Sequence, residues 1–182
     1  MEIYEPREDS NLLANQVIKT VTKNVKALDM GTGSGVIVEA LLTKTNDVTG
    51  ADINPYAIEY ASKKYPKAKF VQSDLFNNIK DKYDVITFNP PYLPEDKRED
   101  LETALMTTGG TEGYELLIKF LTQAIKHLNK TGCILALFST LSKPDVILKK
   151  AEEIGYKHET LASQKIFFET LYVVRFTPIL KP

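Results

Sequence analysis

Short apolar runs that read as buried β-strands alternate along the chain with stretches whose apolar residues recur at helical spacing. This alternation predicts a mostly parallel β-sheet with helices on both faces, because parallel neighbours need helical crossovers. The last two runs have no helical stretch between them, so they can pair as a hairpin and make one strand antiparallel. The expected strands cover residues 25–30, 47–51, 68–72, 83–88, 134–138, 157–162 and 169–176. The expected helices cover 36–42, a segment that begins at Asn54-Pro55, Leu117 to Leu128 (ended by a loop over 129–132) and 144–154.

Size, charge and cysteine content argue against several classes of protein. The 182 residues suffice for one domain with a substantial core. A net charge of −1 gives no support for broad electrostatic binding to nucleic acid. The single cysteine, Cys133, lies in an apolar run and cannot form an internal disulfide, and with only His127 and His158 beside it no metal site is expected. The acidic N-terminus without an apolar signal region and the lack of a membrane-length apolar stretch predict a cytoplasmic protein.

The tetrapeptide Asn89-Pro90-Pro91-Tyr92 directly follows the strand expected over 83–88. Two consecutive prolines cannot continue a central strand, because each lacks the N–H that the ladder needs. The chain is therefore expected to leave the sheet with a stiff backbone that holds an amide and an aromatic ring at its carboxyl edge. This arrangement suits chemistry on a planar nitrogen, but the four residues alone fit more than one acceptor.

A glycine-rich loop, Asp29-Met30-Gly31-Thr32-Gly33-Ser34-Gly35, follows the first expected strand. The spacing departs from the dinucleotide fingerprint G-x-G-x-x-G, since Val36 stands where the third glycine belongs. Asp29 comes two residues before the first glycine. A carboxylate there would repel a pyrophosphate and attract an ammonium group of a ligand.

Two further carboxylates are expected at the same edge of the sheet. Asp52 ends the second strand, 21 residues after Gly31, where a carboxylate can accept hydrogen bonds from both ribose hydroxyls. Asp74 follows the third strand and can accept from an adenine amino group, with Leu75 beside the ring. Three acids without a phosphate-binding lysine indicate a cationic nucleoside without phosphates, for which S-adenosylmethionine is the candidate.

Together these motifs resemble those of class I S-adenosylmethionine-dependent methyltransferases, in which the N-P-P-Y version marks members that methylate planar nitrogens of adenine or glutamine. The segment Tyr4-Glu5-Pro6-Arg7-Glu8-Asp9-Ser10 is similar to the N-terminal motif of HemK-like release-factor glutamine methyltransferases, most closely of their short archaeal and eukaryotic branch. Residues 109–113 and 167–171 are similar to that branch as well. The resemblance implies an α/β fold with a Rossmann-like seven-stranded sheet. It also implies one methyltransferase domain over 1–182, with a motif and helix in 1–23 and the core in 24–182.

The resemblance also implies a partner. Bacterial members carry an extra N-terminal helical domain, whereas this chain has room there for only one helix. The short branch works with a small zinc-containing activator of the Trm type, which is expected on the edge of the third strand. Phe70 and Val71 are candidate contacts for the activator, and they can equally be ordinary core residues. The inner face of the N-terminal helix is expected to present Leu13, Val17, Ile18 and Val21.

By the same resemblance, the expected substrate is the glutamine of a Gly-Gly-Gln loop in a peptide-chain release factor. The Asn89 side-chain oxygen and the Pro90 carbonyl would accept the two N–H groups of the glutamine amide, and Tyr92 would pack over the planar group. The resemblance assigns catalysis to Asn89, Pro90 and Tyr92, and substrate binding to these three together with Pro91. The cofactor-binding residues that it implies are Ser10, Asp29, Gly31, Gly33, Asp52, Asp74, Leu75 and Asn89.

Two alternatives stay open at the level of sequence. The same tetrapeptide serves methylation of adenine N6 in nucleic acid, although the near-neutral charge and the lack of a target-recognition domain disfavour it. A catalytically silent cofactor-binding scaffold is the other, which the intact Asn89-Pro90-Pro91-Tyr92 disfavours. Methylation of protein lysines remains possible as a secondary activity.

Overall fold

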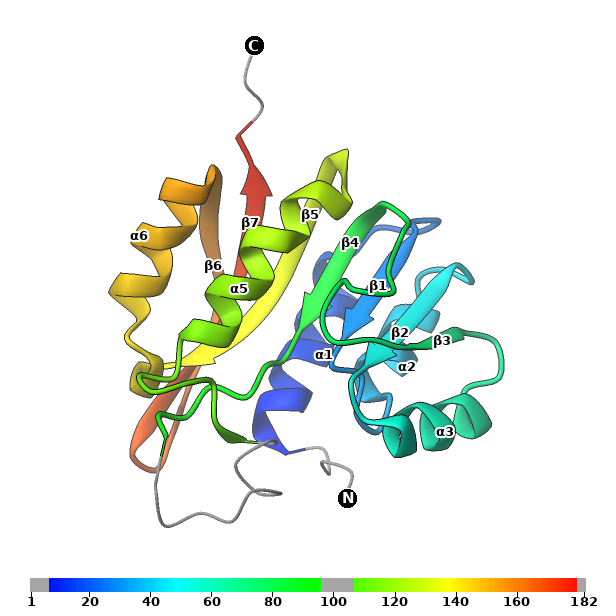
Figure 1. Ribbon diagram of the computed structural model, residues 1–182, viewed down its shortest axis with the longest axis horizontal. Helices are drawn as coiled ribbons and strands as arrows, with labels where there is room; N and C mark the ends of the chain where they lie inside the picture. Colours follow the sequence, from blue (N-terminus) through cyan, green and yellow to red (C-terminus); the bar gives the residue numbers. More distant parts are fainter. Residues whose placement is uncertain (1–6, 96–106, 180–182) are drawn as a thin grey trace.

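The computed structural model describes residues 7–95 and 107–179, so the expected motif residues Tyr4, Glu5 and Pro6 lie outside the described part. In the described part, seven strands form one sheet in the order β3-β2-β1-β4-β5-β7-β6 (Figure 1). β7 is antiparallel to both of its neighbours, and the other neighbouring pairs are parallel. The predicted mixed sheet and terminal hairpin are confirmed. The strands are β1 (Ala27–Met30), β2 (Val48–Asp52), β3 (Lys69–Gln72), β4 (Tyr83–Phe88), β5 (Leu128–Ser139), β6 (Tyr156–Ile166) and β7 (Glu169–Pro178).

Helices cover both faces of the sheet, as Figure 1 shows. α1 (Glu8–Thr20) and α2 (Val36–Leu42) share a core with one face, and α5 (Glu115–Ala124) and α6 (Pro144–Ile154) share a core with the other. α3 (Pro55–Lys64) packs beside β2 and β3. It begins where expected, because the Asn54 side chain accepts a hydrogen bond from the Tyr56 N–H and Pro55 fits the first helical position. Two short 3₁₀ turns are η1 (Ile125–His127) and η2 (Thr140–Ser142).

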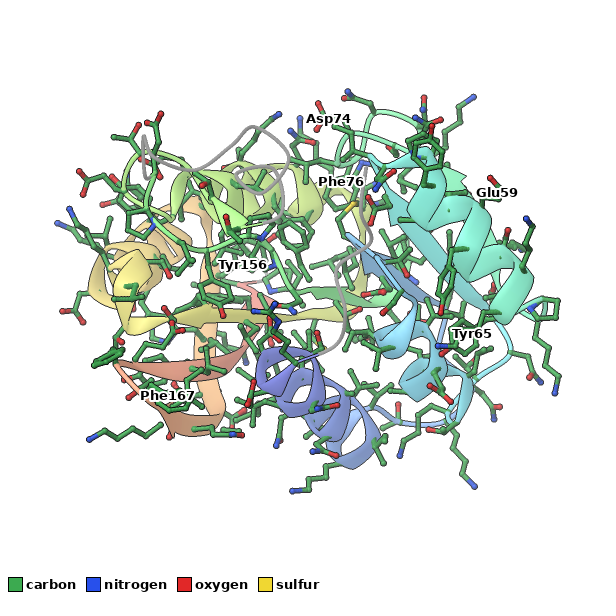
Figure 2. All side chains as sticks on the ribbon, turned by 90° about the horizontal axis from the view of Figure 1, so that it is seen from below. Glu59, Tyr65, Asp74, Phe76, Tyr156 and Phe167 are labelled. Atoms are coloured by element: carbon green, nitrogen blue, oxygen red, sulfur yellow. The ribbon has the colours of Figure 1, made fainter. Side chains whose placement is uncertain are left out.

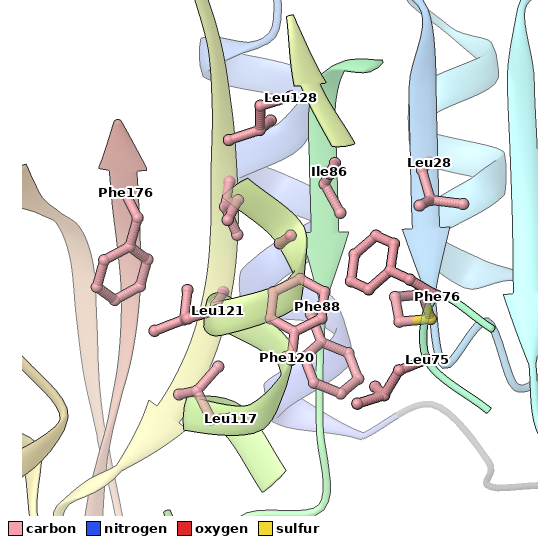
Figure 3. Close-up of a cluster of buried hydrophobic side chains, with 14 of the residues drawn as sticks. Leu28, Leu75, Phe76, Ile86, Phe88, Leu117, Phe120, Leu121, Leu128 and Phe176 are labelled. Atoms are coloured by element: carbon pink, nitrogen blue, oxygen red, sulfur yellow. The ribbon is translucent and has the colours of Figure 1, made fainter. Parts of the chain in front are cut away.

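Several aromatic rings pack together in the core on the α5 side of the sheet (Figure 3). The Phe120 ring of α5 lies 4.3 Å from the Phe88 ring at the end of β4 and 5.5 Å from the Phe76 ring, centroid to centroid. Phe76 belongs to the segment that follows β3. The same packing therefore anchors both the end of β4 and the loop that carries Asp74.

Three expectations from the sequence were wrong in detail. Residues 129–132 are not a loop, because β5 begins at Leu128, which had been assigned to the preceding helix. Leu128 pairs with Tyr83 and Cys133 with Val85, so residues 129–132 lie in the register shift between these two pairs. Asn129 Nδ2 donates there to Asp84 Oδ1 at 2.7 Å. Ile18 was expected on the inner face of α1 but is 44% exposed. The other three residues predicted for that face, Leu13, Val17 and the C-cap residue Val21, are buried. Leu13, Val17 and Val21 recur every four residues, and the residue after Val17 is turned off that stripe by about 100°.

No helix in the ranges 7–95 and 107–179 is long and apolar enough to cross a membrane.

Candidate active site

The carboxyl ends of β1, β2, β3 and β4 meet at one edge of the sheet because all four strands are parallel. Met30 of β1 is level with Ala51 of β2 on one side and with Phe88 of β4 on the other. The residues at or just after these strand ends are therefore brought to the same edge. They are Asp29, Gly31, Gly33, Asp52, Asp74, Leu75 and Asn89.

Asp29 is the most deeply buried carboxylate of this edge, with 1% of its surface exposed. Oδ1 accepts a hydrogen bond from the Thr87 hydroxyl at 2.8 Å. Oδ2 is buried and has no hydrogen-bond partner among the described residues. Burial raises the pKa of Asp29 to about 7, although the hydroxyl groups of Thr87 and, more weakly, of Thr32 act in the opposite direction. A buried carboxylate oxygen without a donor fits the ammonium group of a ligand, which would supply both a charge and N–H donors.

The glycine loop leaves room for a ligand beside Asp52. A Cβ added to Gly33 would have no heavy atom within 4 Å, and its φ of +49° suits glycine. Its N–H donates to Asp52 Oδ2 at 2.8 Å, and the Asn54 N–H donates to Asp52 Oδ1 at 2.8 Å. Burial raises the pKa of Asp52, and these two N–H donors oppose that shift. The carboxylate is thus fixed in direction, and each oxygen keeps a second lone pair for a hydroxyl donor.

Asp74 and Leu75 differ in how open they are. The Asp74 carboxylate is exposed and lies 3.8 Å from the Lys119 ammonium of α5, an exposed pair that contributes little to stability. Leu75 is only 7% exposed and belongs to the α5-side core, with a φ of +46°. The Ser73 hydroxyl donates to the Leu75 carbonyl at 2.7 Å and holds this turn. Asp74 is accessible to a ligand, whereas Leu75 contributes a mostly buried side chain.

Asn89 is held by the N-terminal helix. Its side-chain Nδ2 donates to Asp9 Oδ2 at 3.1 Å and lies 3.4 Å from the Ser10 hydroxyl oxygen. Asp9 and Ser10 are both buried at the start of α1. Because a carboxylate can only accept, the nitrogen of the Asn89 amide must face Asp9. The Asn89 Oδ1 atom then points elsewhere, and it is buried without a hydrogen-bond partner among the described residues.

Sequence reasoning missed two residues of this site. Asp9 was noticed only as part of a motif, and nothing in the sequence indicated that it would contact a residue 80 positions away. Thr87 was passed over as part of an apolar run. Its signal was a hydroxyl inside a buried strand, and the register that pairs Thr87 with Asp29 explains the hydrogen bond.

The Pro90–Tyr92 backbone rests on a glycine-rich loop. The Leu93 N–H donates to the Thr107 carbonyl at 2.8 Å, and the Gly109 N–H donates to the Leu93 carbonyl at 2.9 Å. A Cβ on Gly109 would lie 2.6 Å from the Pro91 carbonyl oxygen, and one on Gly113 would lie 2.6 Å from that of Tyr92. This packing explains why residues 109–113 carry glycines. Pro90 is buried, and Tyr92 is partly buried against the α1-side core.

The sheet order, the acids at three strand ends and the amide at the fourth define the class of S-adenosylmethionine-dependent methyltransferases. The chain belongs to the methyltransferase small domain family, whose model matches residues 7–167. The family membership makes this protein a methyltransferase with S-adenosylmethionine as its cofactor. The unpaired Asp29 Oδ2 and the space at Gly33 fit such a cofactor.

Several relatives are named for methylation of proteins. The chain is 38% identical to a Methanocaldococcus jannaschii protein named "Putative protein N5-glutamine methyltransferase", over 95% of this chain and 90% of that one. It is 28% identical to the human methyltransferase HEMK2, over 97% and 90%. The solved structure of the E. cuniculi Mtq2–Trm112 complex, described as responsible for methylation of the translation termination factor eRF1, superimposes with a TM-score of 0.82 at 30% identity. That match covers 98% of this chain and 99% of the other.

The chain covers only part of the length of several bacterial relatives. It spans 30%, 60% and 62% of the release factor glutamine methyltransferases of Fusobacterium nucleatum, Lactococcus lactis and Rhodopirellula baltica. The likeness to these proteins therefore concerns only the shared part.

Proposed function

We propose that this protein transfers a methyl group from S-adenosylmethionine to the side-chain amide nitrogen of a glutamine, in the Gly-Gly-Gln loop of a peptide-chain release factor. The observation that carries the proposal is the orientation of Asn89. Its nitrogen is committed to Asp9, and its buried Oδ1 is left to accept an N–H from a planar amide. The relatives named for glutamine methylation and the Mtq2 structure support the choice of glutamine. A substrate that works in translation would place the enzyme in the cytoplasm.

The cofactor site is part of the proposal. The bound cofactor would supply an electrophilic methyl group on a sulfonium centre. Asp29 Oδ2 would hold its ammonium group, and the Asp52 carboxylate would accept from ribose hydroxyls while its direction is fixed by the Gly33 N–H. Asp74 would accept from the adenine amino group, and Leu75 would line that end of the site. Ser10, Gly31 and Asn89 would complete the contacts.

An amide nitrogen is a poor nucleophile because its lone pair is delocalised into the carbonyl. Asn89 Oδ1 would accept one N–H of the substrate amide, and the Pro90 carbonyl would accept the other. Both hydrogen bonds strengthen as positive charge develops on the nitrogen, so they stabilise the transition state more than the ground state. Tyr92 would cover the planar group and exclude water, and the fixed geometry supplies proximity. The displaced proton can leave to water after transfer.

A small activator protein on the β3 edge is the proposed partner, and zinc in that activator is implied by resemblance alone. β3 lies at the end of the sheet and pairs only with β2 among the described strands, and an edge strand offers backbone groups for pairing. Phe70 packs against the α1-side core and Val71 against the α5-side core, and both remain partly exposed. The Mtq2–Trm112 complex supports such a heterodimer.

Labelled methyl transfer tests the proposal. The protein is incubated with labelled S-adenosylmethionine and a folded release factor, with and without a Trm112-type protein, and the methylated residue is mapped by mass spectrometry. Parallel reactions contain RNA, duplex DNA or histone-type lysine peptides. Label on the glutamine of the Gly-Gly-Gln loop is expected. Label only on nucleic acid, or only on lysine, would contradict the assigned acceptor.

Asn89→Ala separates catalysis from cofactor binding. The variant loses the side-chain oxygen that would orient the acceptor, so a fall in kcat of about a hundredfold or more is expected, in the range seen when one oriented hydrogen-bonding group is removed. Cofactor affinity by calorimetry should weaken only modestly, because Asp29 and Asp52 remain. Turnover close to that of the unchanged protein would rule out the role given to Asn89.

A further inference from the structure

The turn between β6 and β7 presents two phenylalanines to solvent. Phe167 is 92% exposed and Phe168 is 97% exposed, more than any other large apolar side chain in the described part of the chain. Neither ring belongs to either hydrophobic core. Adjacent, fully exposed aromatic rings do nothing for the stability of the fold, and they mark a contact surface more often than an isolated exposed leucine does.

The backbone conformation of this turn is unfavourable for phenylalanine. Two residues join the paired ends Ile166 and Glu169, and Phe167 has a φ of +24°. A two-residue hairpin turn with positive φ at its first position is normally made by glycine. Strained conformations of bulky residues are found where a side chain serves something beyond folding. The rings are therefore held at the tip in spite of the preference of the turn.

The tip projects from the same edge of the sheet as the active site. β6 runs parallel to β4, because β7 between β5 and β6 is antiparallel to both. Three strand spacings separate β4 from β6, or about 14 Å. Phe88 at the end of β4 is level with Ala136 of β5. Three residues further along β5, Ser139 is level with Leu171 of β7, which is level with Gln164 of β6. Phe167 comes three residues after Gln164, so it lies six residues beyond the end of β4, or about 20 Å. Figure 2, seen from below Figure 1, looks onto this edge and shows Phe167 at the hairpin.

These distances indicate how large a molecule must be to contact both the active site and the hairpin tip. The tip lies roughly 24 Å from Phe88, the last residue of β4, by the same spacings, and a standard protein interface of about 800 Å² per partner spans about 30 Å. A folded protein bound at Asn89 can therefore reach the tip, whereas a free base or a peptide of about five residues, which spans at most about 18 Å, cannot. Leu141, 42% exposed in η2 at the end of β5, lies between the two places in the strand order. The Thr170 N–H donates to the Thr140 hydroxyl at 3.0 Å and ties η2 to the base of the hairpin.

The charge around the tip disfavours other kinds of partner. Lys165 and Glu169 flank the two rings with opposite signs. Nucleic acid and anionic membranes are bound through clusters of lysine and arginine, which this hairpin end does not have. Aromatic side chains without net charge are typical of the central contacts of protein interfaces.

We propose that Phe167 and Phe168 form a second docking point for the folded protein that carries the methyl acceptor. The inference rests on the proposed function and adds to it a residue pair that selects a folded substrate over its isolated loop. The rings insert into an apolar depression of the substrate, while Asn89 receives the acceptor side chain.

The test compares two substrates and three forms of the protein. Phe167→Gly/Phe168→Ser removes both rings and gives the turn a sequence that its backbone prefers, so the fold is retained. Ile179→Ser is the matched control, because it removes an exposed apolar side chain at the opposite end of the same hairpin. The substrates are a folded release factor and a short synthetic peptide with the same Gly-Gly-Gln loop, each with the activator present. For the double variant, kcat/KM on the folded protein is expected to fall about tenfold or more, mostly through KM, and kcat/KM on the peptide is expected to stay unchanged.

Each outcome decides the proposal. Equal loss on protein and peptide, or no loss on either, overturns the docking role. In another outcome, the double variant keeps full methylation of the folded protein and loses a different interaction. Lost self-association in light scattering, lost binding to anionic phosphatidylserine vesicles or lost binding to RNA would then assign the rings to another partner and overturn the docking role. If the unchanged protein methylates neither substrate on glutamine, the proposed function itself fails and the docking role falls with it.

Discussion

Asp9 and Asn89 are 80 positions apart in the sequence and are joined by a hydrogen bond of 3.1 Å. The consequence of this contact is directional. An asparagine amide can rotate to exchange its oxygen and nitrogen, and a carboxylate partner prevents the exchange. In the proposed reaction Asp9 would therefore serve as a positioning residue, because it would act only through Asn89.

Asp9→Ala should lower kcat by about tenfold to a hundredfold, because the amide of Asn89 can then present its nitrogen to the substrate as readily as its oxygen. Cofactor affinity should change little. Glu8→Ala is the control, since Glu8 is the exposed acidic neighbour in the same first turn of α1. Steady-state kinetics and calorimetry measure the two effects. Asp9→Asn should be intermediate, and identical kcat for the Asp9→Ala and Glu8→Ala proteins would contradict the positioning role.

The buried Asp29 carboxylate lowers the stability of the folded protein, and in the proposed function it would bind the cofactor. Its pKa is raised to about 7 in the folded protein, above the ordinary value near 4. The folded state then holds the proton more tightly than the unfolded state, so stability falls as the pH rises through the window from about 4 to about 7. Asp29→Asn should remove this loss. Without cofactor, the variant should be more stable than the unchanged protein at pH 8, by about 4 kcal/mol at most.

Urea unfolding at pH 4.5 and pH 8 measures this difference. The two proteins should have closer unfolding free energies at the lower pH, where Asp29 is protonated in the folded state. A variant that is less stable than the unchanged protein at pH 8 would show that the Asp29 carboxylate is not strained by burial.

At the scale of elements, the loop over residues 109–113 sets the position of the Pro90–Tyr92 segment, to which the proposed function assigns catalysis. Gly109 and Gly113 let one backbone lie directly against the carbonyl groups of Pro91 and Tyr92. Pro90 and Pro91 stiffen the segment internally, and the loop over 109–113 fixes it relative to the sheet. The loop in turn leads into α5, where the Glu115 carboxylate accepts from the Glu112 N–H at 3.0 Å.

Gly113→Ala should damage both stability and activity. The new Cβ would lie 2.6 Å from the Tyr92 carbonyl oxygen, and φ is +86°. A loss of about 2 kcal/mol or more is expected from strain and displacement, with kcat reduced at least tenfold. Gly155→Ala is the control, because its φ is +113° but the nearest atom to its Cβ is 3.9 Å away, at the end of α6. Thermal unfolding and kinetics on both variants separate backbone strain, which both share, from the movement of Tyr92, which only Gly113→Ala causes.

At the scale of the whole molecule, one sheet separates two hydrophobic cores. Neither core is complete without the sheet, and the strands contribute alternate side chains to each. We therefore expect the molecule to unfold as one unit.

Phe120→Ala on the α5 side and Leu13→Ala on the α1 side test this expectation. Both side chains are fully buried, so each variant should lose about 3–4 kcal/mol. Each should lower the midpoint of one shared transition, seen at the same temperature by far-ultraviolet and near-ultraviolet circular dichroism. Two separate transitions in either variant would show that the cores fold independently.

The sequence was informative about strand ends and less so about contacts between distant segments. β4 was predicted with its bounds, because an apolar run ended by two prolines has a sharp boundary. The start of β5 was missed, since Asn129-Lys130-Thr131-Gly132 has the composition of a turn, and the strand begins before it only because Leu128 pairs with Tyr83. In the site, the acids at strand ends were foreseeable from the parallel sheet. The hydrogen bonds of Asp9 and Thr87 were not, because they depend on how α1 and β1 pack against β4.

If the buried carboxyl group of β1 holds the ammonium group of the cofactor as proposed, cofactor binding should release a proton. At pH 6 Asp29 is mostly protonated, and an arriving ammonium group favours its ionised form, so a proton should pass to the buffer when S-adenosylmethionine binds. The heat of binding should then vary with the ionisation enthalpy of the buffer at pH 6, in proportion to the protons released, and much less at pH 8. The Asp29→Asn protein should give the same heat in every buffer. Acidification below pH 7 would accordingly weaken cofactor binding, although the same group makes the cofactor-free fold more stable there.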